Sequence, residues 1–229
     1  MKKIYGEGAL SMLACSRSFI FTSRSEAPAG SKQTEGKAVV SYKQHSFDDG
    51  GNSLVTKSVY QMNKFGKNYE FFSNELPDYL NCKAVSLKDM SMLIAYYDGN
   101  AAIFDKNCTQ KWSGSLKYKG FAPADVVAEG DFLWCSYPES NAVIKYNLNS
   151  MQQTFRAGGS QSGGIIEPYG LWLHDNRLII TSSASGVILS LNLDTFYAEE
   201  LLDVGEPALQ YMKIDSNEIV LTRTGIYKL

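Results

Sequence analysis

The sequence repeats one pattern of short apolar runs about every 42 residues, and this repeat limits the possible folds more than any other feature. The first set of runs follows polar turns and ends in a small or hydroxyl residue, as in FLWCS at 132–136, LIITS at 178–182 and IVLT at 219–222. A second set follows each of these runs. Its anchor residues are 43, 41, 44 and 39 residues apart: Val59, Ala102, Val143, Val187 and Ile226.

A third set of runs opens with proline and keeps nearly the same spacing. Its prolines are 46, 45 and 39 residues apart: Pro77, Pro123, Pro168 and Pro207. Proline is common at the first residue of a strand, where the sheet needs no N–H donor. Four short strands in each unit of 40 to 45 residues are typical of a propeller blade, and the runs lack the 3.6-residue period of a helical repeat. The sequence therefore predicts an all-β, five-bladed β-propeller with four-stranded antiparallel blades.

The two ends of the chain share a phrase, which reads GEGAL at 6–10 and GEPAL at 205–209. Each phrase begins the innermost strand of a unit. The last unit then has only three strands before the C-terminus, and residues 2–5 precede the first phrase. We therefore expect the N-terminal strand to complete the last blade and to close the ring, which would hide unpaired strand edges. Residues 1–229 would form a single domain.

The first unit carries an insertion. In the other units, 7 to 11 residues separate the start of the second strand from the anchor of the third strand. In the first unit these positions are Phe19 and Val59, which are 40 residues apart. The extra residues, about 24–54, should follow the second strand, and KAVVSYKQ at 37–44 could form an added strand.

The blade phrase resembles the NHL and YncE-like propeller families over nearly the whole chain outside residues 24–54. A second resemblance is to the SMP-30/gluconolactonase-like family, because Gly6-Glu7-Gly8 matches a phrase that carries a metal-ligand glutamate there. The starts Pro123-Ala124-Asp125 and Pro168-Tyr169-Gly170 do not keep the further ligands of that six-bladed family. This resemblance implies the alternative function, a metal-dependent lactonase or hydrolase with one divalent cation near Glu7 and Asp125.

Propellers usually bind their partners on the face where inner strands begin. On this face we expect partner-binding tyrosines, carboxylates and one arginine: Arg24, Tyr97, Tyr137, Asp78, Asp125, Tyr169 and Glu206. The tyrosines offer an apolar ring with a polar tip, and the carboxylates, with Glu7, would line an acidic entrance to the central channel. The alternative is that the tyrosines pack against adjoining loops and that the carboxylates are solvated strand starts.

Composition excludes several classes of function. The net charge is −2 with a pI near 5.8, which indicates neither nucleic acid nor an anionic membrane as a partner. The N-terminus is too polar for a signal peptide, so we expect a cytoplasmic protein or a subunit of a larger assembly such as a viral tail. No catalytic set or cofactor motif is recognisable. The sequence favours a non-catalytic binding or scaffold module for a protein or glycan, without a cofactor.

Overall fold

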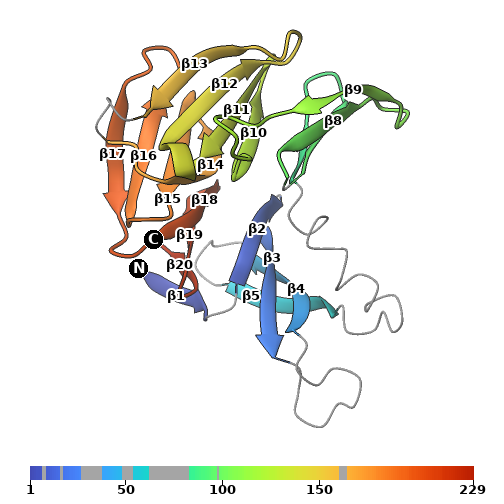
Figure 1. Cartoon of the computed structure of the whole chain (residues 1–229). Helices are drawn as coiled ribbons and strands as arrows, with labels where there is room; N and C mark the ends of the chain where they lie inside the picture. Colours follow the sequence, from blue (N-terminus) through green and yellow to red (C-terminus); the bar gives the residue numbers. More distant parts are fainter. Residues whose placement is uncertain are drawn as a thin grey trace. The chain divides into compact units, whose positions relative to one another are not determined.

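A computed structural model describes residues 1–6, 9–15, 18–26, 38–47, 54–61, 83–96, 98–159 and 164–229. These residues contain one 3-10 turn, Pro138–Ser140 (η2), and no α-helix. Their strands form five sheets of four strands each (Figure 1). The chain divides into two compact units, Met1–Asn74 with Gln210–Leu229, and Glu75–Leu209. We call them unit 1 and unit 2.

Sheet 1 lies in unit 1, and its third strand is not the one that the repeat predicts. Its strands run in chain order and are β2 (Ala9–Cys15), β3 (Ser18–Glu26), β4 (Ala38–Phe47) and β5 (Leu54–Gln61). The third strand is therefore β4, from inside the expected insertion, and the run around Val59 belongs to the fourth strand. In this arrangement nine residues of β3 pair with residues of β4, from Ser18↔Ser46 to Glu26↔Ala38. The repeat also predicts a fourth strand at KNYEFF, residues 67–72, which lie outside the described residues.

Sheet 5 is completed by the N-terminus, as the shared phrase predicts. Its order is β1-β20-β19-β18, formed by β18 (Ala208–Ile214), β19 (Asn217–Thr222), β20 (Ile226–Lys228) and β1 (Lys2–Tyr5). Lys2 pairs with Lys228 and Lys3 with Tyr227, so the two chain ends lie side by side (Figure 1). The Lys3 ammonium also lies 5.5 Å from the centre of the Tyr227 ring.

Sheets 5 and 1 pack together within unit 1. The Tyr5 ring in β1 lies 4.5 Å, centre to centre, from Phe21 in β3, and 6.4 Å from His45 in β4. Phe21 and His45 are both fully buried, so β1 contributes to the core of the unit as well as to the edge of its sheet.

Unit 2 contains sheets 2, 3 and 4, each a four-stranded antiparallel meander in chain order. Sheet 2 has β6 (Lys83–Ser86), β7 (Met92–Ala95), β8 (Asn100–Phe104) and β9 (Gln110–Ser115). Sheet 3 has β10 (Asp125–Glu129), β11 (Phe132–Tyr137), β12 (Ala142–Asn147) and β13 (Gln153–Gly158). Sheet 4 has β14 (Pro168–His174), β15 (Arg177–Ser182), β16 (Val187–Asn192) and β17 (Ala198–Asp203).

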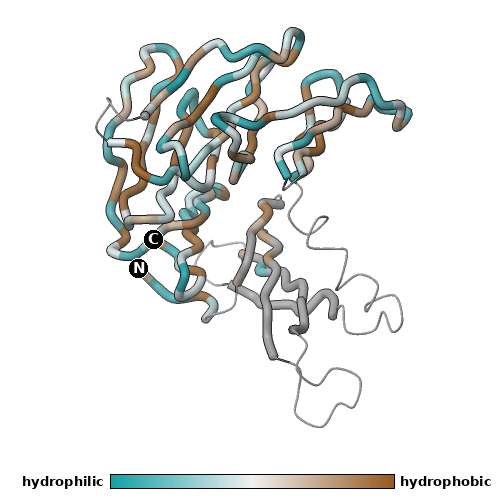
Figure 2. Tube along the Cα trace, viewed as in Figure 1, coloured by the Kyte–Doolittle hydropathy of each residue, from teal (hydrophilic) through white to brown (hydrophobic). Residues whose placement is uncertain are grey.

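The strand assignments made from the repeat are confirmed in sheets 3 and 4. In sheet 2 the first strand differs, because β6 begins at Lys83 and not at Pro77, which lies outside the described residues. Residues of the second and third strands are buried on both faces, as their continuous apolar runs predict. Figure 2 shows that the sheets of this unit carry both hydrophobic and hydrophilic stretches.

The cores of unit 2 lie between neighbouring sheets. Leu93 and Ala101 of sheet 2 cluster with Leu133, Cys135 and Ile144 of sheet 3. A second cluster joins sheets 3 and 4, and it contains Trp134, Val143, Leu171, Leu178, Ile180 and Leu191. Successive residues of β11 thus face opposite sheets, which is expected for a strand with apolar neighbours on both sides.

Candidate functional site

Asp125, at the start of β10, lies at the centre of a buried polar cluster in unit 2. Its side chain is 6% exposed and forms an ion pair with Lys83 at the start of β6. Carboxylate oxygen Oδ1 also accepts a hydrogen bond from the N–H of Val126, and Oδ2 accepts one from the N–H of Leu171 in β14, each at 2.8 Å. The carboxylate therefore connects the first strands of sheets 2, 3 and 4.

Hydroxyl groups near the ends of two second strands also connect first strands of neighbouring sheets. In sheet 3, Ser136 accepts a hydrogen bond from the N–H of Asp125 at 3.0 Å and donates one to the carbonyl of Tyr169. In sheet 4, Thr181 accepts from the N–H of Gly170 at 2.8 Å and donates to the carbonyl of Leu209 at 3.0 Å. The same device thus occurs twice, and each hydroxyl binds the first strand of its own sheet and that of the next.

Tyr169 brings an aromatic ring to this cluster, in β14 beside Asp125. Its backbone is fixed by Ser136, while the residue remains 38% exposed. Burial raises the pKa of the Tyr169 phenol above its usual value, and the nearby charges of Asp125 and Glu139 raise it further. The hydroxyl therefore stays protonated at neutral pH and can donate a hydrogen bond.

Tyr137 is in a different environment from the one expected. It is fully buried, its hydroxyl donates to the carbonyl of Leu116, and it lies 3.2 Å from the hydroxyl of Tyr146. The expectation of a partner-contacting ring is wrong for this residue, and the alternative, packing against an adjoining loop, is correct. Tyr137 differs from Tyr169 because the link between sheets 2 and 3 covers it.

The remaining candidate residues are only partly described. Glu7, Asp78 and Tyr97 lie outside the described residues. Arg24 is in β3, and the structure does not describe its side chain. Glu206 is half-buried in the turn before β18. The described site therefore unites two of the expected residues, Asp125 and Tyr169.

Three members of the cluster were not expected to be site residues, namely Lys83, Ser136 and Thr181. The sequence shows that second strands end in small or hydroxyl residues, but the partners that Ser136 and Thr181 have in the next sheet leave no local signal. Lys83 forms an ion pair with the Asp125 carboxylate. The predicted role of Asp125 at an open acidic entrance does not agree with this burial.

Within the described ranges, no three His, Cys, Asp or Glu side chains come together in a group that could hold a metal ion. No helix in this part of the chain is long and apolar enough to cross a membrane.

The five sheets define an all-β protein built from propeller-like blades. No protein-family model and no curated protein matches the chain. Among solved structures, the computationally designed Ika4 protein matches with a TM-score of 0.48 and 10% identity, over 64% of this chain and 88% of that one.

Two larger proteins match over part of their length. The Kuenenia stuttgartiensis hydrazine synthase has a TM-score of 0.47 and 10% identity, over 60% of this chain and 44% of that one. The WD40 repeats of RRP9 have a TM-score of 0.49 and 11% identity, over 63% of this chain and 49% of that one. The chain thus spans less than half of either protein, and similarity at this level says nothing about what it binds.

Proposed function

We propose that the protein is a non-catalytic binding or scaffold module that recognises a protein or glycan through Tyr169 and the neighbouring starts of the first strands. The observation that carries the proposal is a partly exposed tyrosine on a fixed backbone beside a neutralised ion pair. A rigid aromatic ring with a polar tip contributes contact area at a low entropic cost. Asp125 is committed to two backbone N–H groups and one ammonium group, which suits a support for the site.

We further propose that the five sheets form one closed, five-bladed propeller of the NHL/YncE-like type. In such a ring each first strand neighbours the next. The Lys83–Asp125 pair links sheets 2 and 3, Asp125 and Leu171 link sheets 3 and 4, and Thr181 and Leu209 link sheets 4 and 5. The junction of sheets 5 and 1 has a matching contact, from the N–H of Met12 to Gln210 Oε1 at 2.6 Å. Four of the five junctions thus have a polar link that supports the ring.

The binding role is tested by comparing Tyr169→Ala with the wild-type protein on a glycan array and in affinity capture from the native source. Tyr197→Ala is the matched control, because Tyr197 is 68% exposed in the turn before β17, away from the first strands. We expect Tyr169→Ala to lose the ligand and Tyr197→Ala to retain it. Retention of every ligand at unchanged affinity by Tyr169→Ala would remove this surface as the binding site.

A further inference from the structure

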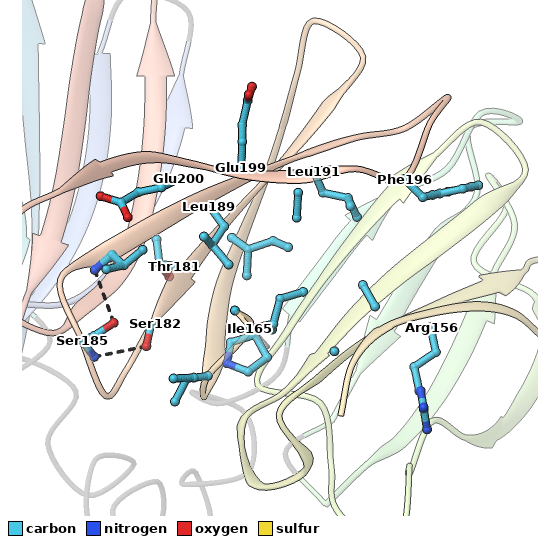
Figure 3. Close-up of a pocket in the computed structure, with 18 of the residues that line it drawn as sticks. Arg156, Ile165, Thr181, Ser182, Ser185, Leu189, Leu191, Phe196, Glu199 and Glu200 are labelled. Carbon is cyan, nitrogen blue, oxygen red and sulfur yellow. Dashed lines mark hydrogen bonds between the residues drawn. The ribbon is translucent and has the colours of Figure 1, made fainter. Parts of the chain in front are cut away.

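A second candidate site lies in unit 2, in a groove between sheets 3 and 4. The groove has a volume of about 610 Å³. Figure 3 shows Leu189, Leu191 and Phe196 from β16 and the turn after it, with Ile165 and Arg156 from the other side. The alternate residues Val187, Leu189 and Leu191 line the groove, and this size and apolar lining are typical of protein ligand sites.

The groove reaches the open edges of two strands. Among the strands that the structure describes, β13 and β17 are each the last of their sheet and have one neighbouring strand apiece. Four consecutive residues of β13, 155–158, line the groove, and so do Ala198, Glu199 and Glu200 of β17. Side chains of consecutive strand residues point to opposite faces, so a run of this kind means that the groove extends to the strand edge. An open edge carries main-chain N–H and C=O groups that can pair with an added strand.

The wall of the groove is held in place before any ligand binds. The Phe196 ring stacks on Phe155 with the ring centres 4.0 Å apart. The ammonium group of Lys145 lies 4.1 Å from the centre of the Phe132 ring and 5.7 Å from that of Phe196, and it pairs with Glu129 at 3.0 Å. The turn that carries Phe196 is thus fixed against sheet 3 by stacking and cation–π contacts.

The charges at the rim suggest the composition of a ligand. Glu199 is paired with Arg177, whereas Glu200 is an exposed carboxylate that lines the groove. Arg156 lies on the opposite strand and donates a hydrogen bond to the Tyr118 hydroxyl at 3.3 Å. A ligand that crosses the groove therefore binds more tightly if it carries a positive charge next to Glu200.

We propose that this groove binds an extended peptide segment of a partner protein, which adds as a strand at the edge of β13. Apolar side chains at alternate positions of the peptide enter the groove beside Leu189, and a lysine or arginine faces Glu200. In this mode of recognition the main-chain hydrogen bonds provide affinity and the pockets for alternate side chains provide specificity. The site is separate from Tyr169 and does not depend on the function proposed for that residue.

The test uses the full chain and a displayed library of random linear dodecapeptides. We expect selection to enrich peptides with alternating apolar residues and a basic residue. Glu200→Lys, a change at an exposed position, should weaken their binding by up to about fivefold, since an exposed ion pair contributes up to about 1 kcal/mol. Asp131→Lys is the control, because Asp131 is exposed in the turn between β10 and β11 of sheet 3, and it should leave the affinity unchanged.

Two further measurements locate the peptide. Bound peptide should slow amide hydrogen exchange in residues 155–158, and Leu189→Glu should abolish binding. The proposal fails if no such peptide is enriched, or if the enriched peptides bind Glu200→Lys and Leu189→Glu as tightly as the wild-type protein. It also fails if protection appears only elsewhere, or if Leu189→Glu instead abolishes a dimer formed by two copies of the chain.

Discussion

The buried Asp125 carboxylate accepts a hydrogen bond from the N–H of Leu171 at 2.8 Å, and this bond joins the first strands of two neighbouring sheets. Gln210 makes the equivalent contact in unit 1, where its side-chain oxygen accepts from the N–H of Met12 at 2.6 Å. Neighbouring sheets are thus connected by side chains that satisfy main-chain N–H groups, in addition to apolar packing. Such bonds matter because a buried N–H without a partner is costly.

Replacing Asp125 by alanine should therefore destabilise the protein by about 2–4 kcal/mol, because the N–H groups of Val126 and Leu171 lose their acceptor. Lys83 is 37% exposed, so its ammonium group can be hydrated after the change. Asp125→Asn keeps one acceptor oxygen and should cost less. Urea denaturation of the three proteins measures the difference. Equal stability of wild type and Asp125→Ala would show that the carboxylate does not support the sheets.

Removing the Tyr137 hydroxyl should cost about 1–2 kcal/mol, since the Leu116 carbonyl would remain buried without this donor. Tyr197→Phe is the matched control, because Tyr197 is 68% exposed and its hydroxyl can bond to water. Thermal and urea unfolding of both variants would measure the effect. If loss of the Tyr137 hydroxyl and Tyr197→Phe had the same small effect, the hydrogen bond of the Tyr137 hydroxyl would not contribute to stability.

Alkaline pH should destabilise the protein, starting near the ordinary thiol pKa of about 8.5. Burial raises the pKa of Cys135 well above this value in the folded state. The unfolded chain therefore loses a proton that the folded chain keeps, so stability is complete below pH 8.5 and falls above it. The fall attributable to Cys135 should reach about 2 kcal/mol at pH 10.

The variant Cys135→Ala should remove that part of the decline, measured as the free energy of unfolding between pH 7 and 10. Cys108→Ala, which removes an exposed thiol, is the control and should keep the decline. An unchanged pH dependence in Cys135→Ala would show that this thiol is not protected from ionisation by folding.

The repeat predicted most strands because each blade has a local signature, an apolar run after a polar turn. It failed in sheet 1, where the spacing assigned the third strand to the residues around Val59 instead of β4. A residue period assumes uniform loop lengths, and a long β3–β4 hairpin breaks this assumption. The pairing of residues 2–5 was predictable because the shared phrases show which strand the last blade lacks.

The site was less predictable than the fold. The repeat predicted that Asp125 and Tyr169 lie near one another, but it did not predict how exposed either side chain is. Asp125 is buried because Lys83, 42 residues earlier, pairs with it, and Tyr137 is buried because the link between two sheets covers its ring. Both effects arise from contacts between sheets, which leave no periodic signal within either strand.

The closed five-sheet ring is tested most directly at the junction of sheets 1 and 2. Leu13 in β2 is 66% exposed, and Met90 in the turn after β6 is 72% exposed. Spin labels at Leu13→Cys and Met90→Cys, in a chain whose native cysteines are replaced, report the distance between sheets 1 and 2. The ring predicts one narrow distribution near 20 Å, because packed sheets lie about 10 Å apart and the label arms add to this spacing. A broad distribution centred beyond about 35 Å, more than three sheet spacings, would contradict the ring.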